Sequence, residues 1–243
     1  KVKEILSWYP AATDQQKENL LKIINHGRIG GSGKFVILPT DQGFEHGPAR
    51  SFALNPPAYN PLYLAELAVR AGCNAYAAPL GTLEAAIEII EKNDLPIILK
   101  VNSHDLMMPD HKDPFPALTS WVDDAVRLKA QAVGITIYPG SVHAREMYQQ
   151  VRELVADARK AGLVVIVWAY PRGSGLRDDK DVSASDAETA VDVVSYAVQV
   201  ACQLGAHVVK CKATKKAIGL ESNMKKGIYD KLAIETLADR TKL

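Results

Sequence analysis

The chain has 243 residues, of which 47% are hydrophobic, and its 29 basic and 28 acidic side chains leave a formal net charge of +1. This composition fits a globular protein with a sizeable core, and a balanced charge without a block of one sign argues against nucleic-acid-binding and membrane-binding proteins. We therefore expect a small-molecule partner, no nucleic acid and no membrane.

Short apolar runs alternate along the chain with longer segments whose apolar residues recur every three or four positions. This alternation is typical of a parallel sheet with crossover helices. A helical extension is predicted at about 1–30. The predicted strands are residues 34–38, 74–78, 96–101, 133–138, 163–169 and 207–212, and a long loop is predicted at 105–117. The predicted helices are residues 61–72, 82–93, 119–130, 141–162 and 185–205.

A barrel of eight βα units typically has about 250 residues. We predict an α/β fold of this TIM (β/α)8 type, in one domain over residues 1–243, to which the chain supplies about six βα units. Residues 213–243 contain helix-like stretches and no β-branched run for a further strand. We expect the last two strands on residues outside this sequence, which opens with Lys1 and stops inside a helix-like pattern. The alternative is an open sheet.

The cysteines and the longest apolar run indicate a cytoplasmic protein. Cys73, Cys202 and Cys211 are an odd number without CxxC spacing, and each lies in or beside an apolar segment where a reduced thiol is expected to pack. The longest apolar run, residues 163–170, is far shorter than the roughly 20 residues that cross a bilayer. No basic-then-apolar leader opens the chain, so we expect neither anchor nor export.

Functional side chains of such barrels follow the strands. The stretch DQGFEHGPARSF, residues 41–52, follows the first predicted strand and contains Asp41, His46 and Arg50. We expect this stretch to form the rim of a substrate mouth, where His46 and Arg50 meet a phosphate by their charge and position. The alternative is a turn whose charges are solvated.

Two aromatic residues end the fifth predicted strand. Trp168 and Tyr170 share parity, so both are predicted to project to the same side of the sheet. A tyrosine at a strand end can exchange a proton with a substrate. The alternative is aromatic packing under the following loop.

Lys210 follows Val208 and Val209 inside the sixth predicted strand. We expect it to be buried, and lysine is almost never fully buried without a reason. Burial and the neighbouring Lys212 would both disfavour the ammonium form and leave a neutral amine able to attack a carbonyl. The alternatives are a lysine paired to a carboxylate, and Lys100, at the end of the third strand, as a rival nucleophile or electrostatic helper.

Two further patterns depart from the motifs that they resemble. Residues 27–35 look like a phosphate cradle, but Arg28 stands where the motif has Gly, and Phe35 replaces the Ser or Thr that holds magnesium. Loop histidines could gather a divalent ion, but they lack HxH or HExxH spacing; they are His46, His104 and His111. We therefore predict no metal site.

Four stretches together, LPTDQGFEHGPARSFALNPPAYNP, NAYAAPLG, VWAYPRG and GAHVVKCK, resemble the archaeal-type class I fructose-1,6-bisphosphate aldolases. The similarity is to their bacterial branch in particular, within the DeoC/FbaB-like aldolases, and runs over roughly residues 5 to 213. It implies that Lys210 is the Schiff-base lysine, Tyr170 the acid/base, Trp168 its neighbour and Asp41 the carboxylate for the carbinolamine steps. The candidate substrate-binding residues are Lys100, His46, Arg50, Arg172 and Lys212.

The resemblance implies reversible cleavage of fructose 1,6-bisphosphate in glycolysis or gluconeogenesis, without a cofactor, by a homo-oligomer built from pentamers, such as a decamer. This sequence departs from the family pattern because it lacks the glycine-rich phosphate-binding loops after the seventh and eighth strands. Three alternatives remain: a related Schiff-base aldolase for another sugar phosphate or keto donor, a metal-dependent aldolase, and a non-catalytic incomplete barrel with a role in assembly.

Overall fold

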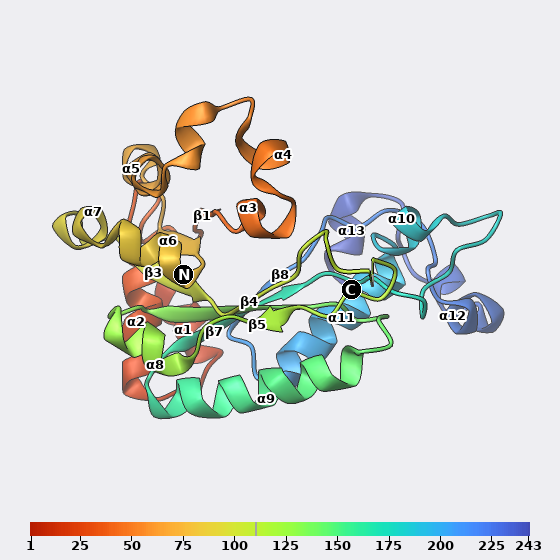
Figure 1. The fold of residues 1–243 in the computed structure, drawn as a ribbon. Helices are drawn as coiled ribbons and strands as arrows, with labels where there is room; N and C mark the ends of the chain where they lie inside the picture. Colours follow the sequence, from red (N-terminus) through yellow and green to blue (C-terminus); the bar gives the residue numbers. More distant parts are fainter. Residues whose placement is uncertain (110) are drawn as a thin grey trace. The chain divides into compact units, whose positions relative to one another are not determined.

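The computed structural model describes residues 1–109 and 111–243 and begins with two helices, α1 (Val2–Ser7) and α2 (Asp14–Asn25) (Figure 1). Helix α2 starts with a capping box, in which the Thr13 side chain accepts the Gln16 N–H and the Gln16 side chain accepts the Thr13 N–H. These bonds satisfy N–H groups that have no partner within the helix. The local sequence therefore determines where α2 begins.

The main sheet contains all six predicted strands. They are β1 (Ile37–Pro39), β2 (Ala75–Ala78), β3 (Ile97–Lys100), β6 (Ala132–Ile137), β7 (Val164–Ala169) and β8 (Val208–Lys210). Their order in the sheet follows the chain, and the pairs β1–β2, β2–β3 and β3–β6 are parallel. This is the strand order of a (β/α)8 barrel, whereas in a doubly wound sheet the order of the strands reverses at a switch point. The chain supplies six βα units of this fold.

Burial differs between the inner and outer strands of the sheet. Strands β2, β3, β6 and β7 are buried along their whole length, as is usual for parallel strands between layers of helices. The first strand, β1, is half-buried, and β8 ends in an exposed residue. Among the residues that the structure describes, β8 is the last strand in the order, so no further strand covers its outer edge.

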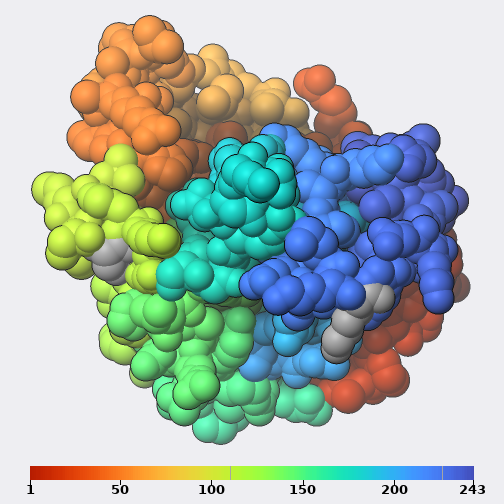
Figure 2. Space-filling view, turned by 90° about the vertical axis from the view of Figure 1, so that its right-hand side faces the viewer, coloured from red at the N-terminus to blue at the C-terminus, as the bar shows by residue number. Residues whose placement is uncertain are grey.

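Along the chain, the helices after β1 alternate with the strands and continue after β8. They are α3 (Gln42–Glu45), α4 (Pro48–Phe52), η1 (Pro56–Tyr59), α5 (Pro61–Ala71), α6 (Leu80–Ala85), α7 (Ile87–Lys92), α8 (Val122–Arg127), α9 (Ala144–Lys160), α10 (Ala184–Ala187), α11 (Val191–Leu204), α12 (Glu221–Lys226), η2 (Tyr229–Lys231) and α13 (Leu237–Arg240). Figure 2 shows the segment with α3, α4 and η1, in orange, at the surface.

Three predicted helices differ from the observed ones. The helix predicted at 82–93 is divided into α6 and α7 at Ala86, whose φ of −103° and ψ of 11° leave the helical region. The segment predicted at 185–205 is divided into α10 and α11. Helix α8 begins after Trp121, whose backbone is extended, and ends before residue 130 because Lys129, with a φ of +54°, has left-handed backbone that a helix cannot continue through.

Two very short strands close the base of the predicted loop. They are β4 (Asn102–Ser103) and β5 (Ala117–Leu118), and they pair antiparallel. A two-residue strand is too short to show a period in the sequence, which is why it was not predicted. Position 110 of this loop lies outside the described residues.

The chain divides into two compact units. The first unit comprises residues 1–108, 116–135 and 153–166, and the second comprises residues 109–115, 136–152 and 167–243. The assignment of residues 1–243 to one domain stays a prediction.

The cysteines only partly follow the prediction. Cys73 is buried, whereas Cys202 and Cys211 are exposed, so the expectation that all three thiols pack inside is wrong. Cys202 lies outside the buried stripe of α11, and Cys211 follows the outermost strand. In the described part of the chain, no helix is long and apolar enough to cross a membrane.

Candidate active site

The segment after β1 is anchored at its first residue. The Thr40 N–H donates to the Ala77 carbonyl, and the Thr40 hydroxyl donates to Tyr76 Oη, each at 2.9 Å. Tyr76 is fully buried, and this burial raises the pKa of its phenol to about 12, although the hydrogen bond from Thr40 acts in the opposite direction. Two bonds therefore hold the backbone immediately before Asp41.

The lysine that the first unit buries is Lys100, with 1% of its surface exposed. Its Nζ lies 3.3 Å from Asp41 Oδ2 and 3.3 Å from Glu45 Oε1, and it donates to the Asn102 carbonyl at 2.5 Å. A buried charge is tolerated when it is paired and hydrogen-bonded. The alternative of a buried lysine paired to a carboxylate therefore describes Lys100, and its Nζ donors are engaged rather than presented to a substrate.

His46 and Arg50 lie at the same hollow of the first unit. This hollow, of about 350 Å³, is lined by Gln42, His46, Arg50, Ser51 and Phe52. His46 is half-buried and Arg50 is exposed. The short helices α3 and α4 bring the two candidate phosphate ligands together, although the sequence indicated only a loop here.

Lys210 in the second unit is exposed, so its predicted burial is wrong. The physical reason is the position of β8 at the outer edge of the described sheet. Its Nζ lies 6.0 Å from the centroid of the Trp168 ring and 5.8 Å from that of the Tyr170 ring. These distances are those of cation–π contacts. The prediction that Trp168 and Tyr170 project to the same side is confirmed.

A second group of charges in the same unit contains Arg172 and Lys212. Lys212 Nζ donates to Glu188 Oε2 at 2.9 Å, and Arg172 Nε lies 3.8 Å from Glu188 Oε1. The guanidinium carbon of Arg172 lies 5.4 Å from the centroid of the buried Tyr138 ring. The sequence singled out both cations but not Glu188, because a lone carboxylate between two helical segments matches no motif.

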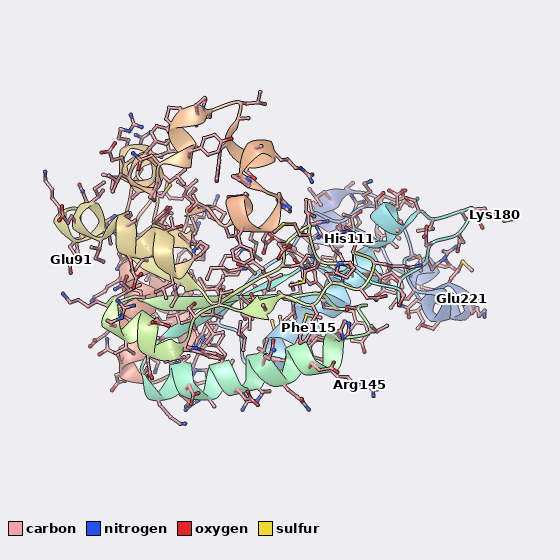
Figure 3. All side chains as sticks on the ribbon, viewed as in Figure 1. Glu91, His111, Phe115, Arg145, Lys180 and Glu221 are labelled. Carbon is pink, nitrogen blue, oxygen red and sulfur yellow. The ribbon has the colours of Figure 1, made fainter. Side chains whose placement is uncertain are left out.

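The loop histidines do not form a metal centre. His104 is buried, whereas His111, labelled in Figure 3, is exposed on the loop after β4. Within residues 1–109 and 111–243, no group of three or more His, Cys, Asp or Glu side chains is placed to hold a metal ion. The chemistry offered by the second unit is instead an accessible amine beside a phenol.

Comparisons with known proteins place the chain in a family. Residues 35–232 match the family model described as DeoC/LacD family aldolase. The chain is similar to the probable fructose-bisphosphate aldolase class 1 of Chlamydia muridarum, with 35% identity over 197 residues, covering 80% of this chain and 54% of the relative. It is also similar to the fructose-bisphosphate aldolase class 1 of Thermoproteus tenax, with 36% identity over 182 residues, covering 75% and 63%. The chain thus spans less than two thirds of the length of these curated relatives.

Solved structures show the same fold. A crystal structure of an archaeal fructose 1,6-bisphosphate aldolase has a TM-score of 0.66 at 35% identity, covering 82% of this chain and 70% of that chain. A second archaeal aldolase structure, with its catalytic lysine covalently bound to the carbinolamine intermediate of its substrate, has a TM-score of 0.67 at 32% identity and the same coverage. With a matching model over most of its length and these structural relatives, the chain belongs to the DeoC/LacD family of aldolases.

Proposed function

We propose that the protein is a class I aldolase that cleaves fructose 1,6-bisphosphate reversibly to dihydroxyacetone phosphate and glyceraldehyde 3-phosphate through a Schiff base. The observation that supports this proposal most is the accessible Lys210 amine over the rings of Trp168 and Tyr170. An amine nucleophile beside a phenol combines the two groups that imine chemistry requires. The activities named for the similar aldolases support the choice of substrate.

In the cleavage direction, the unprotonated Lys210 amine adds to the C2 carbonyl of the open-chain sugar and forms a carbinolamine. Loss of water gives an iminium, which accepts the electron pair of the breaking C3–C4 bond. Glyceraldehyde 3-phosphate leaves as the C4 hydroxyl loses its proton. The remaining enamine is protonated at C3, and water then releases dihydroxyacetone phosphate and restores the amine.

We assign roles to the other candidate residues from the chemistry of their side chains. Tyr170 carries the proton between the C4 oxygen and C3, and Trp168 forms a wall of the pocket. Asp41 assists the carbinolamine steps, and Lys100 holds the Asp41 carboxylate through their ion pair. The basic side chains of Arg50, Arg172 and Lys212 and the imidazole of His46 suit the phosphate groups of the substrate.

The cellular setting is proposed from the family resemblance alone. We propose a cytoplasmic enzyme of glycolysis or gluconeogenesis that assembles as a pentamer-based homo-oligomer, such as a decamer. Sedimentation equilibrium measures the mass of the assembly. A monomer at micromolar concentration would contradict the assembly without affecting the proposed chemistry.

The central experiment is reduction with borohydride in the presence of dihydroxyacetone phosphate, followed by peptide mapping. We expect a stable adduct on Lys210. An adduct on Lys100 would overturn the assignment of the nucleophile, and no adduct would remove the mechanism. A panel of fructose 1,6-bisphosphate, fructose 1-phosphate and other ketose phosphates then separates this aldolase from one that acts on another donor, and turnover should be indifferent to a chelator.

A further inference from the structure

Glu188 has no role in the proposed reaction, yet it bridges two cations of the second unit. One carboxylate oxygen accepts a hydrogen bond from Lys212 Nζ at 2.9 Å, and the other lies 3.8 Å from Arg172 Nε. The Glu188 side chain is 24% exposed, and those of Arg172 and Lys212 are each 34% exposed. Partial burial strengthens these contacts relative to a fully solvated ion pair.

The backbone around Glu188 is held beside the segment that follows β8. The Lys215 N–H donates to the Thr189 carbonyl at 2.7 Å, and the Val191 N–H donates to the Ala217 carbonyl at 3.2 Å. Ala190 and Lys215 form a parallel β-bridge. The carboxylate is therefore carried by a fixed backbone next to the stretch that contains Lys212.

The charges of this group do not cancel. Two cations share one carboxylate, which leaves one surplus positive charge. Glu188 Oε1 lies 3.8 Å from Arg172 Nε, and a guanidinium carries five N–H donors, of which Nε supplies one. The hydrogen bond to Glu188 uses one of the three donors of the Lys212 ammonium. The group therefore retains both the charge and the donors that recognition of a phosphate requires.

The group also lies close in the chain to the proposed nucleophile. Lys212 follows Lys210, the last residue of β8, by two positions. Arg172 follows Tyr170 by two positions. The Tyr170 N–H donates to the Ile137 carbonyl and the Arg172 N–H donates to the Pro139 carbonyl, each at 3.0 Å. Each member of the Lys210–Tyr170 contact thus has one of the bridged cations two positions further along the chain.

We propose that Glu188 is a positioning residue that holds Arg172 and Lys212 as a pair of cations for the phosphate of a ketose phosphate bound at Lys210. This inference rests on the proposed function and adds to it a residue that sets the preference for phosphorylated donors. Without the carboxylate the two cations repel each other, and their long side chains spread over several rotamers. Binding of a phosphate must then fix the two side chains in one arrangement, and this loss of conformational entropy weakens phosphate binding.

The test compares two ketones that differ only in phosphate. Borohydride trapping at Lys210 is measured with dihydroxyacetone phosphate and with dihydroxyacetone, in the wild-type protein and in Glu188→Gln, an isosteric change that removes the charge. We expect trapping of the phosphorylated ketone at limiting concentration to fall about tenfold or more, the size of the loss seen when residues that orient metal ligands are removed. Trapping of dihydroxyacetone should be unchanged, and the loss for fructose 1,6-bisphosphate should appear in KM rather than kcat.

The matched control is Asp186→Asn. This change removes the neighbouring ion pair between Asp186 and Lys215, whose Oδ1 and Nζ are 2.7 Å apart, but leaves the Glu188 bridge. We expect the control to keep the wild-type preference between the two ketones. The positioning role is overturned if Glu188→Gln lowers trapping of both ketones equally, if it leaves both unchanged, or if it gives the same result as Asp186→Asn. The proposed function stands in each of these cases.

A second measurement tests the role of Glu188 in the case that the proposed function is wrong. If the wild-type protein traps neither ketone, inorganic phosphate is titrated against the melting temperature of all three proteins. A larger rise for the wild-type protein and Asp186→Asn than for Glu188→Gln would retain Glu188 as the residue that orders a phosphate site. Equal rises would overturn the inference.

Discussion

Lys100 and Asp41 form an ion pair in the first unit, with Nζ and Oδ2 3.3 Å apart, and the lysine end of this pair is buried. Lys210 in the second unit is instead exposed, and its Nζ lies over aromatic rings. From the sequence, both of these lysines at strand ends were candidates for the nucleophile. Their surroundings now predict opposite effects of the same substitution.

Lys210→Met should abolish imine trapping and turnover while the fold stays intact. The side chain is exposed, and its Nζ lies about 6 Å from the centroids of the two rings, so we expect the free energy of unfolding to change by less than about 1 kcal/mol. A coupled assay of fructose 1,6-bisphosphate cleavage and urea denaturation measure the two effects. Turnover near the wild-type rate would show that another residue is the nucleophile.

Lys100→Met should destabilise the protein by about 3–5 kcal/mol, because it leaves the Asp41 and Glu45 carboxylates, 13% and 14% exposed, without their cation. Lys160→Met is the control, since the ion pair of Lys160 with Asp157 is largely exposed and should contribute less than about 1 kcal/mol. Both values come from urea denaturation. Equal, small losses for the two variants would mean that the buried ion pair does not stabilise the first unit.

Tyr170→Phe should separate imine formation from bond cleavage. Phenylalanine keeps the aromatic face near Lys210 Nζ but removes the hydroxyl that we propose to carry the proton. We expect borohydride trapping of dihydroxyacetone phosphate to continue while kcat falls about 10²- to 10⁴-fold, the usual contribution of a positioned acid or base. Single-turnover kinetics checks this prediction, and an unchanged kcat would assign proton transfer to another group.

The buried Tyr76 phenol should make the protein less stable in alkali. Its pKa is about 12 in the folded protein, raised by burial, against about 10 in an unfolded chain. Below pH 10 both states keep the proton, whereas between pH 10 and 12 the unfolded state loses it first, so stability falls as pH rises. A difference of about two between the folded and unfolded pKa values corresponds to a loss of about 3 kcal/mol in the free energy of unfolding over this pH range.

The measurement for Tyr76 is urea denaturation at intervals from pH 9 to pH 12, in the wild-type protein and in Tyr76→Phe. Phenylalanine has no phenolic proton, so the variant should lack this part of the pH dependence even though it also loses the acceptor of the Thr40 hydroxyl. The comparison therefore uses the slope with pH and not the absolute stability. Parallel slopes for the two proteins would contradict the raised pKa.

Features that depend on short-range periodicity were predictable from the sequence. All six main strands were found because a short apolar run between helical segments is a local pattern. The common orientation of Trp168 and Tyr170 toward Lys210 follows from the two-residue period of a strand. The opening capping box of α2 is likewise determined within four consecutive residues.

The surroundings of each charged group were decided by the tertiary structure. Lys100 and Lys210 both end apolar strands, but β3 is an inner strand with neighbours on both sides, whereas β8 is the last strand of the described sheet. Burial depends on these neighbours, which a single strand does not encode. Glu188 similarly acquires its partner Lys212 across 24 positions of the chain. The sequence by itself determined which residue types stand at the strand ends, and the order of strands in space decided which of them became buried, paired or accessible.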